Sequence, residues 1–363
     1  MNKVNAAITT SEAASRILWL NFKLLVMVYV VHYGRLPVVA GYKLHAVCGA
    51  RASSVAISAP VDESFNQGDT EMSVSEQFVF GADLSGQPVG QALRLANRHG
   101  LVAGATGTGK TVTLQRLIEG FSDAGVAVFA ADVKGDLCGL GAVGAPQGKV
   151  AERIASMPWL THQPTAYPVT LWDIQGQSGH PLRTTLSEMG PLLLGALLEL
   201  TDSQQAALYA AFKVADREGL LLLDLKDLKA LLAHLQSHPE VLGDDSALFT
   251  TTSAQALLRR LSSLEQQGAE ALFGEPALQL EDILHPDRDG RGRIHLLDAS
   301  RLVHEAPKVY ATFLMWLLAE LFEQLPERGD ADKPVLALFF DEAHLLSATR
   351  RRPCRSAWSR WYG

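Results

Sequence analysis

Short apolar runs alternate with longer amphipathic segments from about residue 99 onward. His99–Ala103 and Val126–Asp132 are continuous apolar runs of strand length, and Val169–Asp173 and Arg293–Asp298 repeat the pattern. Runs without polar alternation are typical of strands that are buried on both faces of a parallel sheet. Pro334–Asp341 is the last such run, and it ends in a carboxylate. The pattern predicts an α/β fold with a mainly parallel sheet.

The region from about 180 to 290 differs, because leucines recur there at helical spacing. Thr201 and Gln204 have the spacing of a capping box, and Gly219 stands where such a helix would end. Ser253 is positioned to cap a later helix of the same region. We therefore expect a helical insertion in the α/β domain.

The distribution of charge changes this picture more than the overall composition does. The chain has 363 residues, a net charge of −7 and 47% hydrophobic residues, which excludes a disordered protein. Residues 1–60 carry a net charge of +5, residues 347–363 carry +5, and the centre, 61–346, carries −17. Three separated cysteines form no CxxC pair, which suits a reducing cytoplasm.

The amino-terminal segment does not share the pattern of the centre. Residues 17–31 are apolar, but Asn21 and Lys23 interrupt them, and a bilayer span needs about 20 apolar residues. We therefore expect no stable membrane association. We expect the true start to be Met72, where the acidic and patterned region begins. This would explain why residues 1–71 differ from the centre and makes them an upstream segment.

The carboxyl-terminal segment, 347–363, has five arginines, two tryptophans, no acid and no apolar periodicity. Such a tail could bind nucleic acid. Another reading frame of G/C-rich codons for this tail gives a string with balanced charge and helical spacing. We therefore expect a frameshift after Leu346, a patterned domain over 72–346 and an out-of-frame tail.

A glycine-rich loop, Gly104–Thr111, has the pattern G-x-x-x-x-G-K-T between a predicted strand and a predicted helix. In such a loop, backbone N–H groups point at phosphate oxygens, and the helix dipole adds positive charge. Lys110 can reach the β- and γ-phosphates of ATP, and the Thr111 hydroxyl can bind Mg²⁺. The expected nucleotide-binding residues are Gly104, Ala105, Thr106, Gly107, Thr108, Gly109, Lys110, Thr111 and Val112.

Asp341 and Glu342 end the last apolar strand, where they would complete such a site. We expect Asp341 to be a metal ligand together with Thr111, and Glu342 to polarise the attacking water. Lys110 and Glu342 are thus the expected catalytic residues. The two acids could instead cap a helix, but the nearby phosphate loop favours catalysis.

A second acidic motif, Asp132–Asp136, follows another predicted strand at the sheet edge where ligands collect. It could face the nucleotide or its metal, or it could be a glycine turn with solvated charges. Cys138, His99 and His344 have no partners at ligand spacing, so we expect structural roles for them.

Four separated blocks together resemble the HerA-like ATPases of the HerA/FtsK class. The blocks are Ala96–Thr111, Phe121–Val126, Ala131–Leu137 and Phe339–Leu346. The resemblance covers about 72–346 and implies a RecA-like P-loop fold with Mg-ATP as ligand. It also implies a homo-hexameric ring that moves DNA, which is an analogy at the level of the family.

The chain departs from this family after Leu346. Such proteins continue with a helix, a strand that ends in a polar sensor residue, and an arginine finger. The sensor strand would lie between the phosphate-loop strand and the strand that ends at Asp341. We therefore expect an incomplete sheet with unpaired backbone groups, poor folding and weak or absent ATP hydrolysis.

Three functions are compatible with these residues. The first is an ATP-hydrolysing motor of HerA type that moves DNA. The second is a nucleotide-binding switch or assembly module without a DNA role, which the acidic centre favours because DNA binding normally needs a basic surface. The third is an ATPase tethered to a membrane by residues 17–31.

Overall fold

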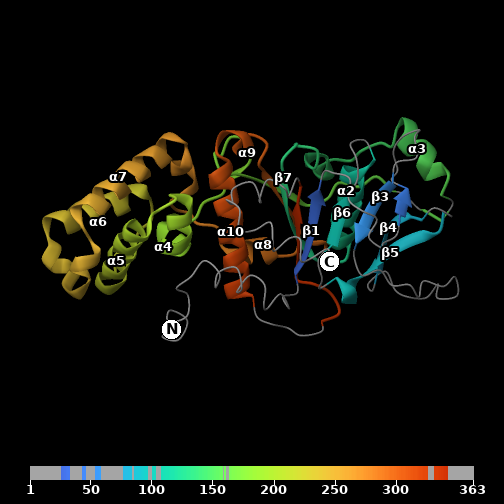
Figure 1. Ribbon diagram of the computed structural model, residues 1–363. Coiled ribbons are helices and arrows are strands. Elements are labelled where there is room, and N and C mark those ends of the chain that lie inside the picture. Colours follow the sequence, from blue (N-terminus) through green and yellow to red (C-terminus); the bar gives the residue numbers. More distant parts are fainter. Residues whose placement is uncertain are drawn as a thin grey trace.

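A nine-stranded sheet forms the centre of the computed structural model (Figure 1), in the order β2-β3-β6-β1-β11-β7-β10-β8-β9. The structure describes residues 26–32, 43–45, 54–58, 77–83, 86–96, 100–103, 108–157, 159–160, 163–325 and 331–341. The strands of this sheet are β1 (Val26–His32), β2 (Lys43–His45), β3 (Ser54–Ser58), β6 (Gly100–Ala103), β7 (Ala127–Asp132), β8 (Val169–Asp173), β9 (His180–Pro181), β10 (Ile294–Asp298) and β11 (Leu336–Phe340). Neighbouring strands from β6 to β9 pair in parallel, which confirms the predicted α/β fold with a mainly parallel sheet.

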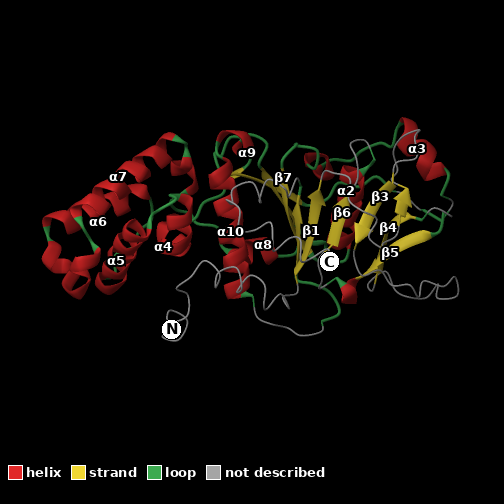
Figure 2. Ribbon diagram, viewed as in Figure 1, coloured by secondary structure: helices red, strands yellow, loops and turns green. Residues whose placement is uncertain are grey.

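Both faces of the sheet are buried. On β7, Phe129 belongs to one apolar cluster and Val128 to a second, and Leu338 and Phe339 of β11 divide in the same way. Helix α2 (Lys110–Asp123) packs on the face of the second cluster, and α10 (Pro307–Gln324) packs on the face of the first (Figure 2). Because neither face meets water, these strands are apolar at consecutive positions.

A hairpin of β4 (Gln77–Ala82) and β5 (Pro88–Ala92) covers the outer side of α2. The Phe78 ring meets the Phe121 ring edge to face, with centroids 5.0 Å apart. A Cβ atom at Gly120 would lie only 2.1 Å from the Phe78 ring, so the contact between hairpin and helix depends on a glycine there.

A helical lobe extends away from the sheet between β9 and β10, as the sequence predicted (Figure 1). Its helices are α4 (Leu186–Leu197), α5 (Asp202–Glu218), α6 (Leu225–Ser237) and α7 (Thr251–Gln266), whereas α8 (Leu280–Leu284) returns to the sheet beside β7 and α10. The shorter elements of the chain are α3 (Gly148–Ala155), α9 (Leu302–Glu305), η1 (Leu93–Leu95), η2 (Cys138–Gly141), η3 (Pro239–Leu248) and η4 (Ala269–Leu272). Within the described ranges, no helix combines the length and the apolar character that crossing a bilayer requires.

The ends of the lobe helices test two sequence predictions. The predicted stop at Gly219 is confirmed, since α5 ends there with φ 67°. The predicted cap at Ser253 is wrong, because α7 begins at Thr251, and Thr250 caps it instead. The hydroxyl of Thr250 accepts a hydrogen bond from the backbone N–H of Ser253 at 3.2 Å. Threonine and serine are both good capping residues, so only the backbone path decides between them.

The position between β6 and β11, where we expected a gap, holds strand β1 (Figure 1). Val30 pairs with Leu101 of β6 on one side and with Phe340 of β11 on the other. The expected gap is therefore closed, because a strand from the segment before Met72 pairs with both neighbours. The predicted frameshift and basic tail fall on residues 347–363, which lie outside the described residues.

His295 of β10 is a buried histidine, 1% exposed, that faces the neighbouring strand β8. The indole N–H of Trp172 donates a hydrogen bond to its Nδ1 at 2.9 Å, and the two rings stack with centroids 5.9 Å apart. Burial, and then the charge of Arg293, lowers the pKa of His295 to about 4. Because Nδ1 accepts, the histidine is neutral and carries its proton on Nε2.

Folding stability is expected to fall by about 3 kcal/mol as the pH drops from about 6.5 to about 4, because of His295. In this window the unfolded histidine takes up a proton, whereas the folded one stays neutral. Protons therefore favour the unfolded state. Urea unfolding at several pH values measures the effect, and His295→Asn should remove it. His304→Asn on α9 is an exposed control, and equal pH dependence of the wild type and His295→Asn would contradict the prediction.

Candidate functional site

The carboxyl ends of the parallel strands meet at one edge of the sheet. Strand β6 leads into the Gly104–Thr111 loop, β7 ends at Asp132, and Asp341 directly follows β11. The backbone N–H of Asp341 donates to the carbonyl of Ala131 at 3.4 Å, which holds the Asp341 backbone beside the end of β7. In open α/β sheets this edge is where ligands bind.

The end of the predicted phosphate loop is fixed against α2. Gly109 caps the helix with φ 93°, a left-handed conformation that glycine adopts without strain. The backbone N–H and the hydroxyl of Thr113 both donate to the carbonyl of Gly109, at 2.9 and 3.1 Å. Thr108 and Lys110 are buried on either side of this glycine, at 1% and 8% exposure. These contacts place Lys110 at the positive end of the helix dipole.

The structure brings most of the described candidate residues to this one edge. Thr108, Gly109, Lys110, Thr111 and Val112 lie at the start of α2, and Asp341 lies at the end of β11. The other candidates, Gly104, Ala105, Thr106, Gly107 and Glu342, lie outside the described residues, as do His99 and His344. Cys138 is exposed, but partial desolvation of its thiol, followed by the charges of Asp132 and Asp298, raises the pKa of that thiol.

Asp132 is the anchor of a turn. Its buried carboxylate accepts hydrogen bonds from the backbone N–H groups of Lys134, Gly135 and Leu137, at 3.1, 2.7 and 2.9 Å. Gly135 has φ 77°, as a tight turn of this kind requires. Of the two interpretations of Asp132–Asp136, these contacts favour the turn, because the carboxylate oxygens already have backbone donors.

Two further aspartates, which the sequence analysis missed, hold loops at the same edge. The carboxylate of Asp173 accepts from the backbone N–H groups of three residues in the loop after β8, namely Gln175, Gln177 and Ser178. Asp298 accepts from the N–H and hydroxyl of Ser300 at 3.0 and 2.6 Å. Burial opposes ionisation of Asp298, but the bonds from Ser300 lower its pKa overall. The sequence signal was an aspartate ending an apolar run, followed by small or polar residues.

Tyr310 is a third residue that the sequence did not indicate. It lies in the first turn of α10 and is 2% exposed. Burial, and then the charges of Asp341 and Asp132, raises the pKa of its hydroxyl. The hydroxyl is therefore neutral at physiological pH, and the charge of Asp341 contributes to this. Nothing in its local sequence distinguishes it from an ordinary core residue of an apolar helix.

The chemistry of this edge fits a phosphate chain and a magnesium ion. The start of α2 and the Lys110 ammonium attract phosphate oxygens, and the oxygens of Thr111 and Asp341 are the ligand type that Mg²⁺ prefers. In the described ranges no group of three His, Cys, Asp or Glu side chains could hold a metal by itself.

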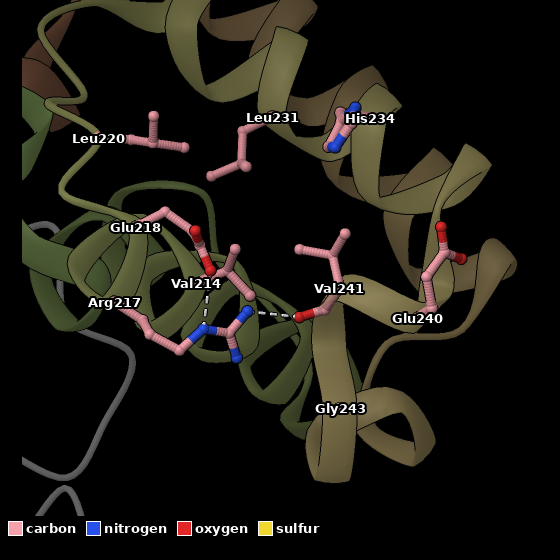
Figure 3. Close-up of a pocket in the computed structure, with 9 residues that line it drawn as sticks. All are labelled: Val214, Arg217, Glu218, Leu220, Leu231, His234, Glu240, Val241 and Gly243. Atoms are coloured by element: carbon pink, nitrogen blue, oxygen red, sulfur yellow. Dashed lines mark hydrogen bonds and ion pairs between the residues drawn. The ribbon is translucent and has the colours of Figure 1, made fainter.

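A pocket of about 650 Å³ lies in the helical lobe, between α5, α6 and η3 (Figure 3). Its lining residues are Val214, Arg217, Glu218, Leu220, Leu231, His234, Glu240, Val241 and Gly243. Arg217 pairs with Glu218 at 3.0 Å and donates to the carbonyl of Val241 at 2.6 Å. Arg217 and Glu218 of this pocket thus pair with each other, and the pocket lies in the helical lobe, away from the sheet (Figure 1).

The fold and this edge define an α/β protein whose mainly parallel sheet brings Lys110, Thr111 and Asp341 to its carboxyl edge. The sequence profile of the family described as Helicase HerA-like C-terminal matches residues 77–353, and the chain belongs to this family. A similar solved structure is VirB4 of Thermoanaerobacter pseudethanolicus, at 18% identity and a TM-score of 0.36. The match covers 65% of this chain and 58% of the VirB4 chain, so this protein spans less than two thirds of VirB4. No curated protein matches the chain.

Proposed function

We propose that this protein binds Mg-ATP at the carboxyl edge of its sheet and hydrolyses it as an ATPase of HerA type. One observation carries the proposal: Lys110 and Thr111, at the start of α2, share the sheet edge with Asp341. Membership of the HerA-like helicase family supports it, because the resemblance to HerA-like ATPases implies Mg-ATP as the ligand.

Each residue has a separate task in the proposed reaction. Lys110 holds the β- and γ-phosphates, and Thr111 and Asp341 hold the magnesium ion. Magnesium, when bound, supplies positive charge to the phosphate oxygens. Glu342 polarises the attacking water by accepting its hydrogen bond. Catalysis of this kind depends mostly on positioning and on electrostatic stabilisation, so small displacements of these groups have large effects on rate.

Replacement of Glu342 by glutamine is expected to keep Mg-ATP binding and to lower hydrolysis by about 100-fold or more, because general bases typically contribute 10²–10⁴-fold. The amide retains the size of the side chain but is a poor proton acceptor. Calorimetric titration measures binding, and phosphate release measures turnover. Glu305→Gln, an exposed change on α9, is the matched control. Normal turnover by Glu342→Gln would refute the role.

The same assays distinguish a DNA motor from a nucleotide-dependent switch. We propose the motor, assembled as a homo-hexamer in the cytoplasm, on the basis of the family. Duplex DNA should then stimulate ATP turnover, and salt should weaken the stimulation. The net charge of −17 over 61–346 supports the alternative, a switch or assembly module. Turnover that is indifferent to DNA would favour that alternative.

A further inference from the structure

The strand that carries the phosphate loop is held in the sheet by the segment that precedes Met72. In the described sheet, β6 lies between β3 and β1. Strand β1 pairs in parallel with β6 from Tyr29 opposite Gly100 onward, and β3 pairs with the other side of β6 in antiparallel fashion. Both neighbours of β6 therefore come from residues 26–58.

We propose that β1 is an integral strand of the nucleotide domain, which sets the separation between the phosphate loop and Asp341. The part of this proposal that concerns the nucleotide rests on the proposed function, whereas the pairing of β1 with β6 and β11 does not depend on it. It competes with a start at Met72, because a chain that began there would lack both β1 and β3.

The geometry of the sheet explains why β1 would control the site. Strand β1 is the only strand between β6 and β11 in the described sheet, so it separates them by two strand spacings, about 10 Å. Its pairing is in register on both sides, since Val30 lies opposite Leu101 and also opposite Phe340. Leu101 lies three residues before the phosphate loop, and Phe340 directly precedes Asp341. A slip of β1 would therefore shift one half of the site against the other.

The backbone hydrogen bonds of β6 also depend on this segment. Without β1 and β3, the backbone N–H and C=O groups on both sides of β6 would lose their partners in the sheet. Buried backbone groups without partners strongly destabilise the strand that carries them. Without these hydrogen bonds, the four residues of β6 could not remain in the sheet. The segment before Met72 would thus be a condition for an ordered phosphate loop.

Disulfide trapping in the full-length protein tests the strand pairing directly. Met27 lies opposite Ala337, so a Met27→Cys/Ala337→Cys pair should form a disulfide on mild oxidation, in most of the molecules. A Tyr29→Cys/Ala337→Cys pair is two residues out of register, more than 7 Å apart by strand geometry, and should not. The native cysteines are replaced by serine in both variants, and the bond is located by peptide mass spectrometry. Equal yields in both pairs, or no bond in either, would overturn the proposal.

Proline substitution tests the link to the site. Val28→Pro removes a backbone donor from a central strand and should weaken Mg-ATP binding at least 10-fold or unfold the protein, whereas Val28→Ala should bind within about threefold of the wild type. Wild-type affinity in Val28→Pro would overturn the proposal. If the Met27→Cys/Ala337→Cys pair forms its disulfide while the wild-type protein fails to bind Mg-ATP, the proposed function alone would be refuted.

Discussion

Replacement of Lys110 by alanine is expected to weaken Mg-ATP binding roughly 100-fold, or about 3 kcal/mol, and to abolish measurable turnover. Lys110 lies at the start of α2, and the residue is 8% exposed. A buried position makes its interaction with phosphate strong, because little water screens it. Removing it would leave the phosphate charges with only the helix terminus and the metal to balance them. Calorimetric titration with Mg-ATP gives the affinity directly.

The control for this experiment is another lysine that lies far from the sheet edge. Lys213 on α5 pairs with Asp245 at 2.6 Å in the helical lobe, and its side chain is 68% exposed. Lys213→Ala removes the same charge and should leave the affinity for Mg-ATP unchanged. The thermal midpoints of both variants show whether they are folded. Unchanged affinity in Lys110→Ala would exclude this loop as the phosphate site.

Replacement of Gly292 by alanine is expected to destabilise the protein by about 4 kcal/mol or more, a loss that would leave much of it unfolded. A Cβ atom at this position would lie 1.8 Å from the carbonyl oxygen of Val126. The clash is with backbone, so no side-chain rotation relieves it. Gly292 also donates to the carbonyl of Ser122 at 2.8 Å and accepts from the Ser122 hydroxyl at 2.6 Å.

These contacts join the end of α2 to the starts of β7 and β10, so a shift there would propagate into the sheet. Urea unfolding followed by circular dichroism measures the loss. Gly144→Ala is the matched control, because a Cβ atom there would meet nothing within 4 Å. A stability for Gly292→Ala within about 1 kcal/mol of the wild type would show that β7 and β10 separate at little cost.

Local sequence predicted those elements whose structure requires a particular type of residue at a particular position. Continuous apolar runs indicated β7, β8, β10 and β11, since only strands buried on both faces need such runs. Gly219 marked the end of α5 for a similar reason, because the left-handed backbone there favours glycine. The cap of α7 was misplaced from Thr250 to Ser253, because both residues offer the same hydroxyl.

The residues of the candidate site likewise fall into those that the local sequence predicted and those that it did not. The glycine-rich loop and Asp341 were predicted because their chemistry requires particular residues at particular spacing. The turn role of Asp132 stayed open, since an aspartate can accept bonds from backbone donors or bind a ligand. Tyr310 was missed, because its relation to Asp341 arises only when α10 packs over the sheet.

The sequence by itself therefore determined the α/β class, the helical insertion, the family and the identity of the groups at the sheet edge. Those properties follow from periodicity, from backbone conformations that few residues adopt, and from functional groups that no other side chain supplies. Only the tertiary structure decided the order of the strands. Hydrogen bonds between strands join backbone groups that every residue carries, so nothing in Val26–His32 specifies β6 and β11 as its neighbours. That choice depends on which position the rest of the sheet leaves open.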